Sequence, residues 1–354
     1  MERVPEFPRA GKQTMAKLRI GVLYDYWWDE DEDRTGEKPR PKRKSPDEDV
    51  QEVYEALKKN GHNPVFLRLD GTPSSLVEIA ESETDLIFNL VESFAGNDGY
   101  DTNVAAFLEL LGRRYTGAGA HGLYLAQDKA LAKKIFAFHG IHTPYFATVF
   151  RGRTEHSHDI QFPVIVKPAR EDGSIGIQFG AVCGSIKELM DRIDYVHAEF
   201  DTPALIEEYI EGRELYVGVL GNEKAEALPV VELDLSKLPE GTPKIAGTEV
   251  KWEEDTQAYQ ATKPFFPDDL DEEVTKKLQD TAVQAFQALQ LKDYGRVDFR
   301  LATDGTVHVL EVNPNPYLMP TAEFSMAAKK SGRSYIETVG EIVELAVARY
   351  AAES

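Results

Sequence analysis

The chain has 354 residues and a formal net charge of −21, with 40 Lys and Arg against 61 Asp and Glu. A charge of this sign disfavours nucleic acids and anionic membranes as partners, because both would repel the protein at long range. Hydrophobic residues make up 42% of the chain, which is typical of a globular protein with two or three domains. The single cysteine, Cys183, rules out an intrachain disulfide, and no apolar run reaches the ~20 residues that a membrane-spanning helix needs.

The N-terminal residues differ from a secretion signal. The stretch MERVPEFPRAGKQT carries charges and proline where a signal peptide would be apolar. With the low cysteine content, this predicts a cytoplasmic protein. We interpret residues 1–17 as a flexible extension.

Residues 18–118 alternate strands with helices. The pattern predicts strands at 18–26, 63–70 and 85–92 and helices at 48–60 and 74–82. Such an alternation is typical of βαβ units, so we expect an N-terminal, Rossmann-like α/β domain with a parallel sheet. The segment 27–49 runs from acidic to basic and is rich in proline, and we interpret it as a mobile, solvated loop. A lid over a site is the alternative.

The rest of the chain mixes helices and strands, so the fold class is α/β and α+β. We expect strands at 162–169, from 177, at 205–210 and at 214–221, and helices at 102–112, 122–139, 268–290 and 334–350. The helix at 122–139 places Leu131, Ile135 and Phe138 on one face, and Ser334 with Glu337 forms a capping box at the start of the last helix. The segment 238–267 is expected to be irregular.

Residues 294–316 predict a β-hairpin that carries two carboxylates. Asp304-Gly305 reads as a two-residue turn, so that Thr303 would pair with Thr306 and Arg300 with Val309. Counting outward, Asp298 then faces Glu311 and Arg296 faces Asn313, all on one face of the ribbon. A bulge would shift this register by one residue.

Two carboxylates opposite each other repel, so a cation must offset them. Arginines of the same face could do so, which would make the hairpin an ion-paired surface element. Alternatively, the two carboxylates and the Asn313 carbonyl oxygen are hard ligands suited to Mg²⁺ bound to a phosphate group. The following Asn-Pro-Asn-Pro run favours the metal site, and we expect neutralisation of either acid to relieve repulsion.

A second candidate site is the glycine-containing loop REDGSIG (170–176). Gly173 lets backbone N–H groups approach an anion closely, and Ser174 can donate a hydrogen bond. Most such loops bind nothing, but Lys167 lies just before this one inside an apolar strand, where a charge needs a partner such as a phosphate. By themselves Lys129, Lys251, Glu207, Glu208 and Glu214 are as compatible with a solvated surface.

In this order, the motifs resemble the ATP-grasp superfamily and, within it, the D-alanine–D-alanine ligase family. The resemblance spans about 85–350, and it rests on YTGAGAHGLYLAQDKALAKKIFAFHGIHTP (115–144), PVIVKPAREDGSIGI (163–177), LIEEYIEGREL (205–215) and DYGRVDFRLATDGTVHVLEVNPNP (293–316). It implies an ATP-grasp fold behind the N-terminal domain, with a central subdomain at 119–206 and a C-terminal subdomain at 207–354 that carries the metal site.

The resemblance also implies roles for individual residues. Asp298, Glu311 and Asn313 would bind two Mg²⁺ ions, for which Mn²⁺ could substitute. The residues implied to bind ATP are Lys129, Lys167, Gly173, Ser174, Glu207, Tyr209, Ile210, Glu214, Lys251 and Leu310. Arg296 would stabilise an oxyanion, and Lys251 would act beside it in catalysis.

The implied activity is the ATP-dependent joining of a carboxylate and an amine through an acyl phosphate, with release of ADP and phosphate. The substrates would be small molecules, and the family allows for a homodimer. The alternatives are a D-alanine–D-alanine ligase proper, or a non-catalytic nucleotide-binding protein on the same scaffold.

The sequence departs from the family pattern where amino-acid substrates would bind. Trp252 stands in place of a tyrosine, Tyr317 in place of a glycine and Ala322 in place of a serine, and the loop after the first strand has no recognisable match. These differences predict a pocket of a different shape from one that holds two alanines.

Overall fold

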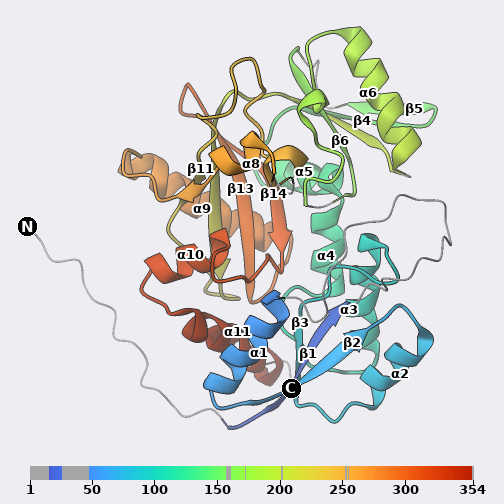
Figure 1. Cartoon of the computed structure of the whole chain (residues 1–354), viewed down its shortest axis with the longest axis vertical. Helices are drawn as coiled ribbons and strands as arrows, with labels where there is room; N and C mark the ends of the chain where they lie inside the picture. The colour runs from blue at the N-terminus through green and yellow to red at the C-terminus, as the bar shows by residue number, and fades with distance from the viewer. Residues whose placement is uncertain are drawn as a thin grey trace, which may run out of the picture.

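The computed structural model describes residues 16–25, 48–156, 161–171, 173–200, 202–251, 253 and 255–352. The predicted extension 1–17 and loop 27–49 lie almost entirely outside the described residues, and Trp252 lies outside them. Three sheets follow one another along the long axis of the molecule (Figure 1). In the described ranges, no helix combines the length and apolar character needed to cross a bilayer.

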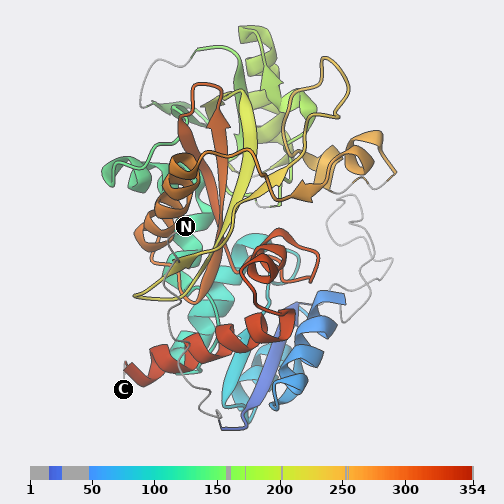
Figure 2. The same cartoon turned by 90° about the vertical axis from the view of Figure 1, so that its left-hand side faces the viewer.

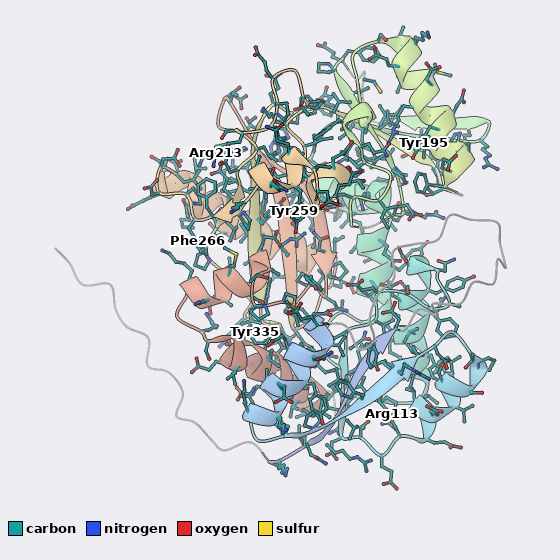
Figure 3. All side chains as sticks on the ribbon, in the orientation of Figure 1. Arg113, Tyr195, Arg213, Tyr259, Phe266 and Tyr335 are labelled. Carbon is teal, nitrogen blue, oxygen red and sulfur yellow. The ribbon has the colours of Figure 1, made fainter. Side chains whose placement is uncertain are left out.

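The N-terminal sheet is parallel, as its βαβ pattern predicted. Its strand order is β2-β1-β3, and its elements are β1 (Arg19–Asp25), α1 (Glu48–Lys59), β2 (Asn63–Leu69), α2 (Pro73–Glu81) and β3 (Leu86–Asn89). Ile20, Val22 and Phe88 are fully buried between this sheet and its helices, and that apolar burial drives the packing. Arg113, labelled in Figure 3, lies in this part of the molecule and donates a hydrogen bond to the carbonyl oxygen of Ser82 at 2.6 Å.

Helices connect this sheet to the central one. After the short 3₁₀ turn η1 (Asp98–Tyr100) come α3 (Asp101–Leu110), α4 (Ala120–Gln127) and α5 (Lys129–Phe138). The single helix predicted at 122–139 is therefore wrong, because Asp128 adopts a non-helical backbone (ψ 91°) and caps α5 through the Leu131 N–H at 2.9 Å.

The face predicted for this helix is confirmed only in part, because Leu131 and Ile135 pack against the core and Phe138 does not. Phe138 is 86% exposed, whereas the buried side of α5 carries Lys129, Ala130, Ala132, Lys133 and Phe136. Because two of these buried residues are lysines, the spacing of apolar residues alone does not predict this face.

The central sheet is antiparallel, with the strand order β5-β4-β8-β6-β7. Its elements are β4 (Phe146–Phe150), β5 (Arg153–His156), β6 (Val164–Pro168), β7 (Val182–Cys183), α6 (Ile186–Glu199) and β8 (Ala204–Glu208). The strand expected from residue 177 is wrong, since residues 179–181 form the 3₁₀ turn η2 (Phe179–Ala181) and only two residues then pair in β7. Tyr195 in Figure 3 marks α6, at the far end of the molecule from Arg113.

The C-terminal sheet lies between the other two. Its order is β12-β11-β9-β13-β14, with β10 paired to β9, and its strands are β9 (Gly212–Leu220), β10 (Glu226–Ala227), β11 (Val231–Leu233), β12 (Pro264–Phe265), β13 (Tyr294–Ala302) and β14 (Val307–Pro314). Helix α9 (Glu272–Ala288) covers one face (Figure 1) and buries Leu278, Ala282 and Phe286 there. The segment 238–267 is less irregular than predicted, because it includes α7 (Thr248–Lys251) and α8 (Gln257–Ala261).

The chain returns to the N-terminal sheet through α10 (Glu323–Lys330) and α11 (Tyr335–Ala352). The predicted capping box is confirmed, with the Ser334 N–H donating to Glu337 Oε2 at 2.9 Å and the Glu337 N–H donating to Ser334 Oγ at 3.2 Å. Figure 2 shows α11 crossing between the C-terminal sheet and the N-terminal part, and α11 packs against α1.

Candidate active site

The β13–β14 hairpin places the two acids opposite each other, as predicted. Asp298 pairs with Glu311 and Arg296 with Asn313. The turn between the strands differs from the prediction, however. The Gly305 N–H donates to Ala302 O and the Ala302 N–H to Thr306 O, both at 2.9 Å, and Gly305 has φ +84°. This is a three-residue loop that ends on a left-handed glycine, rather than a two-residue turn.

The longer turn shifts the pairing near the loop by one residue. Arg300 pairs with His308 instead of Val309, and Leu301 pairs with Val307, so the predicted Thr303–Thr306 and Arg300–Val309 pairs are wrong. A β-bulge at Leu310 then adds one residue to β14 and restores the register at Asp298. The two irregularities cancel, and for that reason the predicted acid pair is correct.

Arg296 holds the first of these acids. Its Nε and Nη2 atoms donate to the two carboxylate oxygens of Asp298 at 2.7 and 2.9 Å, and its Nη1 lies 3.3 Å from Glu323 Oε2. The guanidinium also lies over the Tyr216 ring, 5.1 Å from the centroid. Burial raises the pKa of Asp298 to about 6, against the opposing effect of Arg296.

The second acid is held by lysines. Lys129 Nζ lies 3.2 Å from Glu311 Oε2 and donates to the Glu171 carbonyl oxygen at 2.8 Å. Burial alone would raise the pKa of Glu311, but the positive charges of Lys129, Lys251 and Lys167 hold it well below its usual value. Three predicted phosphate-binding lysines therefore act on one carboxylate.

The donor set fits a hard divalent cation. Within the described ranges, no group of three His, Cys, Asp or Glu side chains could hold a metal ion, so the acid pair would need a further protein ligand and substrate oxygens. Asn313 can supply one, because its buried Nδ2 atom lacks a hydrogen-bond partner, and a rotation of the amide exchanges that atom with the carbonyl oxygen. Two carboxylates and one amide oxygen suit Mg²⁺.

A buried ion triad lies on the central-sheet side of the site. Lys167 Nζ and Lys133 Nζ each lie 2.7 Å from a different oxygen of Glu207, whose side chain is 1% exposed. Burial alone would raise the pKa of Glu207, and the two lysines hold it below its usual value. The sequence analysis missed Lys133; the signal that could have found it is its position four residues after Lys129, on the same helical face.

The predicted phosphate loop contacts the segment that carries Lys251. Ser174, at φ +64°, donates from Oγ to the Ala246 carbonyl oxygen at 2.9 Å. Thr248 Oγ1 donates to Ser174 O at 3.0 Å, and the Thr248 N–H donates to Ile177 O at 2.8 Å. Gly173 adopts φ +60° in the same loop, and Lys251 lies on α7 directly after these contacts.

The other predicted nucleotide ligands lie on or directly after β8, β9 and β14. Glu214 on β9 is ion-paired to Arg300 at 2.7 Å and accepts from the Tyr216 hydroxyl at 3.0 Å. The Tyr209 hydroxyl accepts from the Lys244 N–H at 3.0 Å. Ile210 follows β8 and Leu310 lies in the bulge, and both are half-buried.

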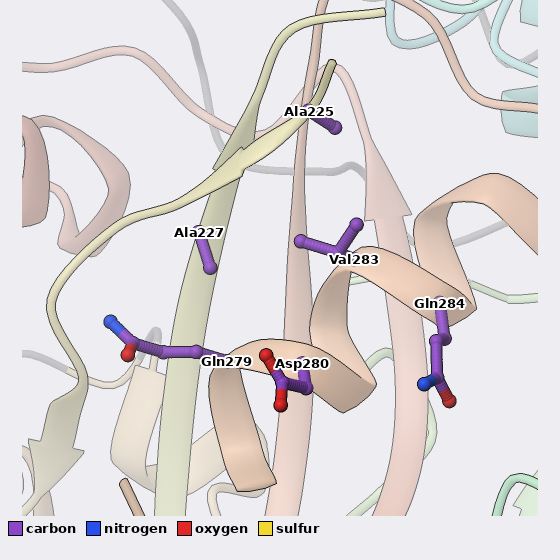
Figure 4. Close-up of a pocket in the computed structure, with 6 residues that line it drawn as sticks. All are labelled: Ala225, Ala227, Gln279, Asp280, Val283 and Gln284. Atoms are coloured by element: carbon purple, nitrogen blue, oxygen red, sulfur yellow. The ribbon is translucent and has the colours of Figure 1, made fainter. Parts of the chain in front are cut away.

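Two residues that depart from the family pattern, Tyr317 and Ala322, lie just after the hairpin. Tyr317 is 48% exposed, and Ala322 begins α10 without a side-chain cap. The turn before them is fixed by Asn315, whose Oδ1 accepts from the Ala118 N–H at 2.9 Å. A hollow between β10 and α9, lined by residues such as Gln279 and Val283 (Figure 4), lies elsewhere and has none of the predicted site residues.

Comparison with known proteins agrees with this arrangement. The family model described as D-ala D-ala ligase C-terminus matches residues 135–344. The D-alanine–D-alanine ligase of Halalkalibacterium halodurans is 36% identical over 301 residues, which cover 83% of this chain and 92% of that protein. The chain belongs to the D-alanine–D-alanine ligase family. It is accordingly an ATP-grasp enzyme that uses ATP to form a C–N bond, and the non-catalytic alternative is set aside.

Further relatives and a solved structure extend the comparison. The ligase of Aquifex aeolicus is 32% identical, with 82% of this chain and 92% of that protein covered. An uncharacterized protein of Sinorhizobium fredii, y4sG, is 33% identical over 84% of this chain and 87% of its own length. The crystal structure of the Bacillus anthracis ligase complexed with ATP superimposes with a TM-score of 0.71 at 22% identity, covering 95% of this chain and all of that one, which confirms the predicted fold class.

Proposed function

We propose that this enzyme joins an amino acid or related carboxylate to an amine through an acyl phosphate. A carboxylate oxygen of the first substrate attacks the γ-phosphorus of ATP, and ADP leaves with the electron pair of the broken P–O bond. The amine then attacks the acyl carbon, and phosphate leaves as the amide forms. The observation that carries the proposal is the Asp298–Glu311 pair surrounded by lysines, because such a site neutralises a transferring phosphoryl group.

Asp298, Glu311 and Asn313 are proposed to hold two Mg²⁺ ions, for which Mn²⁺ could substitute. Bound there, the metal would neutralise phosphate charge and orient the phosphates. Lys129 and Lys251 would contact the phosphates from the side of Glu311, where their charges already act on its pKa. Lys167, Gly173 and Ser174 would contact them from the central sheet.

The adenosine part of ATP is proposed to lie between β8 and the bulge of β14. Glu207 would accept a hydrogen bond from the adenine amine, and the backbone at Tyr209 and Ile210 would align the base. Leu310 would pack on the ring, and Glu214 would bind the ribose hydroxyls after turning from Arg300, its partner at 2.7 Å.

Arg296 is proposed to stabilise the oxyanion when the amine attacks. Its orientation supports this role, because Asp298 fixes the guanidinium through two hydrogen bonds while a further N–H on each terminal nitrogen stays available.

D-Alanine as both carboxylate and amine is the second candidate. The names of relatives such as the Halalkalibacterium halodurans ligase favour it. Tyr317 and Ala322, which depart from the family pattern next to the hairpin, favour a different substrate pair.

A screen of ADP release tests both candidates. The enzyme, with ATP and Mg²⁺, is offered D- and L-amino acids singly and in pairs, and the products are identified by mass spectrometry. We expect ADP release that requires both a carboxylate and an amine. Turnover with D-alanine alone selects the second candidate. If no amino acid or pair in a broad panel causes ADP release, the proposal is contradicted.

Three finer points belong to the same proposal. The substrates are small molecules, and the enzyme acts in the cytoplasm, as the sequence predicted. A homodimer is proposed from the family and is checked by light scattering. The domain boundaries at 118/119 and 206/207 stay predictions, which limited proteolysis would test.

A further inference from the structure

Lys133 has no part in the chemistry proposed above, although its charge is more deeply buried than that of Lys129 or Lys167. Its side chain is 1% exposed, against 7% and 11% for those two lysines. Taking an ammonium group out of water is costly unless it is paired and hydrogen-bonded. Burial lowers the pKa of Lys133, and the nearby Glu207 carboxylate opposes that shift.

The ammonium group of Lys133 connects three separate segments. Its Nζ lies 2.7 Å from Glu207 Oε1 on β8, donates to Thr143 Oγ1 at 2.6 Å and donates to the Leu310 carbonyl oxygen at 3.3 Å. Leu310 is the residue that the bulge adds to β14. One cation on α5 therefore joins the central sheet to the bulge that sets the register of Asp298 and Glu311.

Lys133 also determines how much of the negative charge of Glu207 is left for Lys167 to neutralise. Glu207 divides its two oxygens between the two lysines. Because Lys133 engages Oε1 from the interior, Lys167 contacts only Oε2, and the other N–H donors of Lys167 remain for another anion. Without Lys133, Lys167 would be the sole counter-ion of a buried carboxylate.

We propose that Lys133 is a positioning residue that holds Glu207 and the Leu310 bulge in place for ATP, while Lys167 stays available to a phosphate. The Lys133 ammonium group is engaged by Glu207, Thr143 and the Leu310 carbonyl oxygen, so Lys133 acts on the nucleotide through these partners. The inference rests on the proposed function, because it assumes that Glu207 and Leu310 face the base.

The first test compares Lys133→Met with Lys134→Met. Lys134 is the next residue, but it is 53% exposed, and among the described residues its ion pair is with Glu155 at 3.0 Å. Binding of Mg-ADP is measured by calorimetry, and the KM for ATP, kcat and the preference for ATP over GTP are measured by turnover. We expect Lys133→Met to weaken ADP binding and raise the ATP KM about tenfold or more, as loss of a charged hydrogen bond would, and to reduce the preference for ATP. Lys134→Met should match the wild type.

The second test is a double-mutant cycle with Glu207→Gln. If Lys133 acts by positioning Glu207, the losses of ATP affinity caused by the two changes do not add. Additive losses would overturn the inference, as would a folded Lys133→Met protein with wild-type ATP affinity and nucleotide preference.

Two further measurements separate a failure of the Lys133 inference from a folding defect and from a failure of the proposed function. If Lys133→Met fails to fold in circular dichroism, Lys133→Arg replaces it; this variant keeps the charge but not the three-way contact, so wild-type ATP affinity would overturn the inference. Failure of the wild type to bind Mg-ADP would contradict the proposed function itself. Normal wild-type binding with unchanged Lys133 variants would contradict the role of Lys133 alone.

Discussion

Asp298 and Glu311 face each other across one hairpin, yet their environments differ. Arg296 pairs with Asp298, whose pKa is nevertheless raised to about 6 by burial. Glu311 lies among three lysines that hold its pKa well below its usual value. Neutralisation of either acid was expected to relieve repulsion; the structure corrects this for Glu311, because its charge is already compensated.

Loss of either acid should stop the reaction. We expect Asp298→Asn and Glu311→Gln to reduce kcat/KM by about 100-fold or more, since each removes a charged ligand of the phosphate site. ADP release in the presence of both substrates measures the effect. Wild-type turnover in both variants would remove the metal assignment, and Lys134→Met provides a matched surface control.

The same two variants should change stability in opposite directions. Because the folded pKa of Asp298 lies above its ordinary 3.8, its ionisation destabilises the fold as the pH rises from about 4 to about 6. Without metal, Asp298→Asn should melt at a higher temperature than the wild type, with a difference that is small at pH 4 and complete above pH 6.

Glu311→Gln should melt lower than the wild type at pH 7, since the change leaves Lys129 without its carboxylate partner. Thermal unfolding from pH 4 to pH 8 in a chelator tests both statements. A lower melting temperature for Asp298→Asn at pH 7, or a higher one for Glu311→Gln, would contradict the assigned electrostatics.

At the scale of elements, the phosphate loop and α7 form one closed unit. Ser174 Oγ donates to Ala246 O at 2.9 Å, while Thr248 Oγ1 lies 3.0 Å from Ser174 O and 3.3 Å from Ile177 O. These contacts join the phosphate loop to the segment that carries Lys251, and we expect the two together to cover the site. Such a cover protects an acyl phosphate from water.

Thr248→Val should therefore uncouple ATP cleavage from amide formation. The variant keeps the shape of the side chain but loses its contacts with the phosphate loop, so water reaches the intermediate more often. We expect the ratio of ADP to amide product to rise about twofold or more above the wild-type ratio, given the net value of one hydrogen bond.

Thr262→Val is the matched control, because the Thr262 hydroxyl donates at 2.8 Å to Ala258 O within its own short helix. The ratio is read by a coupled ADP assay and by mass spectrometry of the amide. An equal ratio in both variants would show that the loop contact does not limit water access.

At the scale of the whole molecule, Asp293 joins segments that lie far apart in the sequence. It is fully buried at φ +63°, lies 3.0 Å from Arg349 Nη2 on α11 and accepts from the Gly117 N–H at 2.8 Å and from Asn222 Nδ2 at 3.1 Å. The loop between α3 and α4, the C-terminal sheet and the last helix thus meet at one carboxylate.

Asp293→Ala should destabilise the protein by about 3–5 kcal/mol, because it leaves the largely buried Arg349 without its counter-ion. Asp280→Ala is the control, since Asp280 is exposed and, within the described part of the chain, pairs with Lys276 along α9, and it should cost less than about 0.5 kcal/mol. Denaturant unfolding measures both. Equal midpoints would contradict the role of Asp293 in joining these segments.

Much of the fold follows from local patterns in the sequence. The βαβ alternation and the capping box at Ser334 depend on neighbours a few positions apart, and the structure confirms both. The acid pair was predicted as well, although its register depends on a longer turn and a bulge that cancel each other. Neither irregularity leaves a clear signal, because Asp-Gly fits both turns and Leu310 is an ordinary strand residue.

The tertiary structure alone determines which charged side chains become ion-pair partners. In the sequence, Lys129 and Lys133 are simply two lysines four positions apart in one predicted helix. Packing of α5 against two sheets places Lys129 at Glu311 and Lys133 at Glu207. The same holds for Asp128, which breaks a helix because its carboxylate finds donors on Leu131 and Arg170. Periodicity encodes which side of an element is buried, whereas electrostatic partners from distant segments are fixed only when the sheets come together.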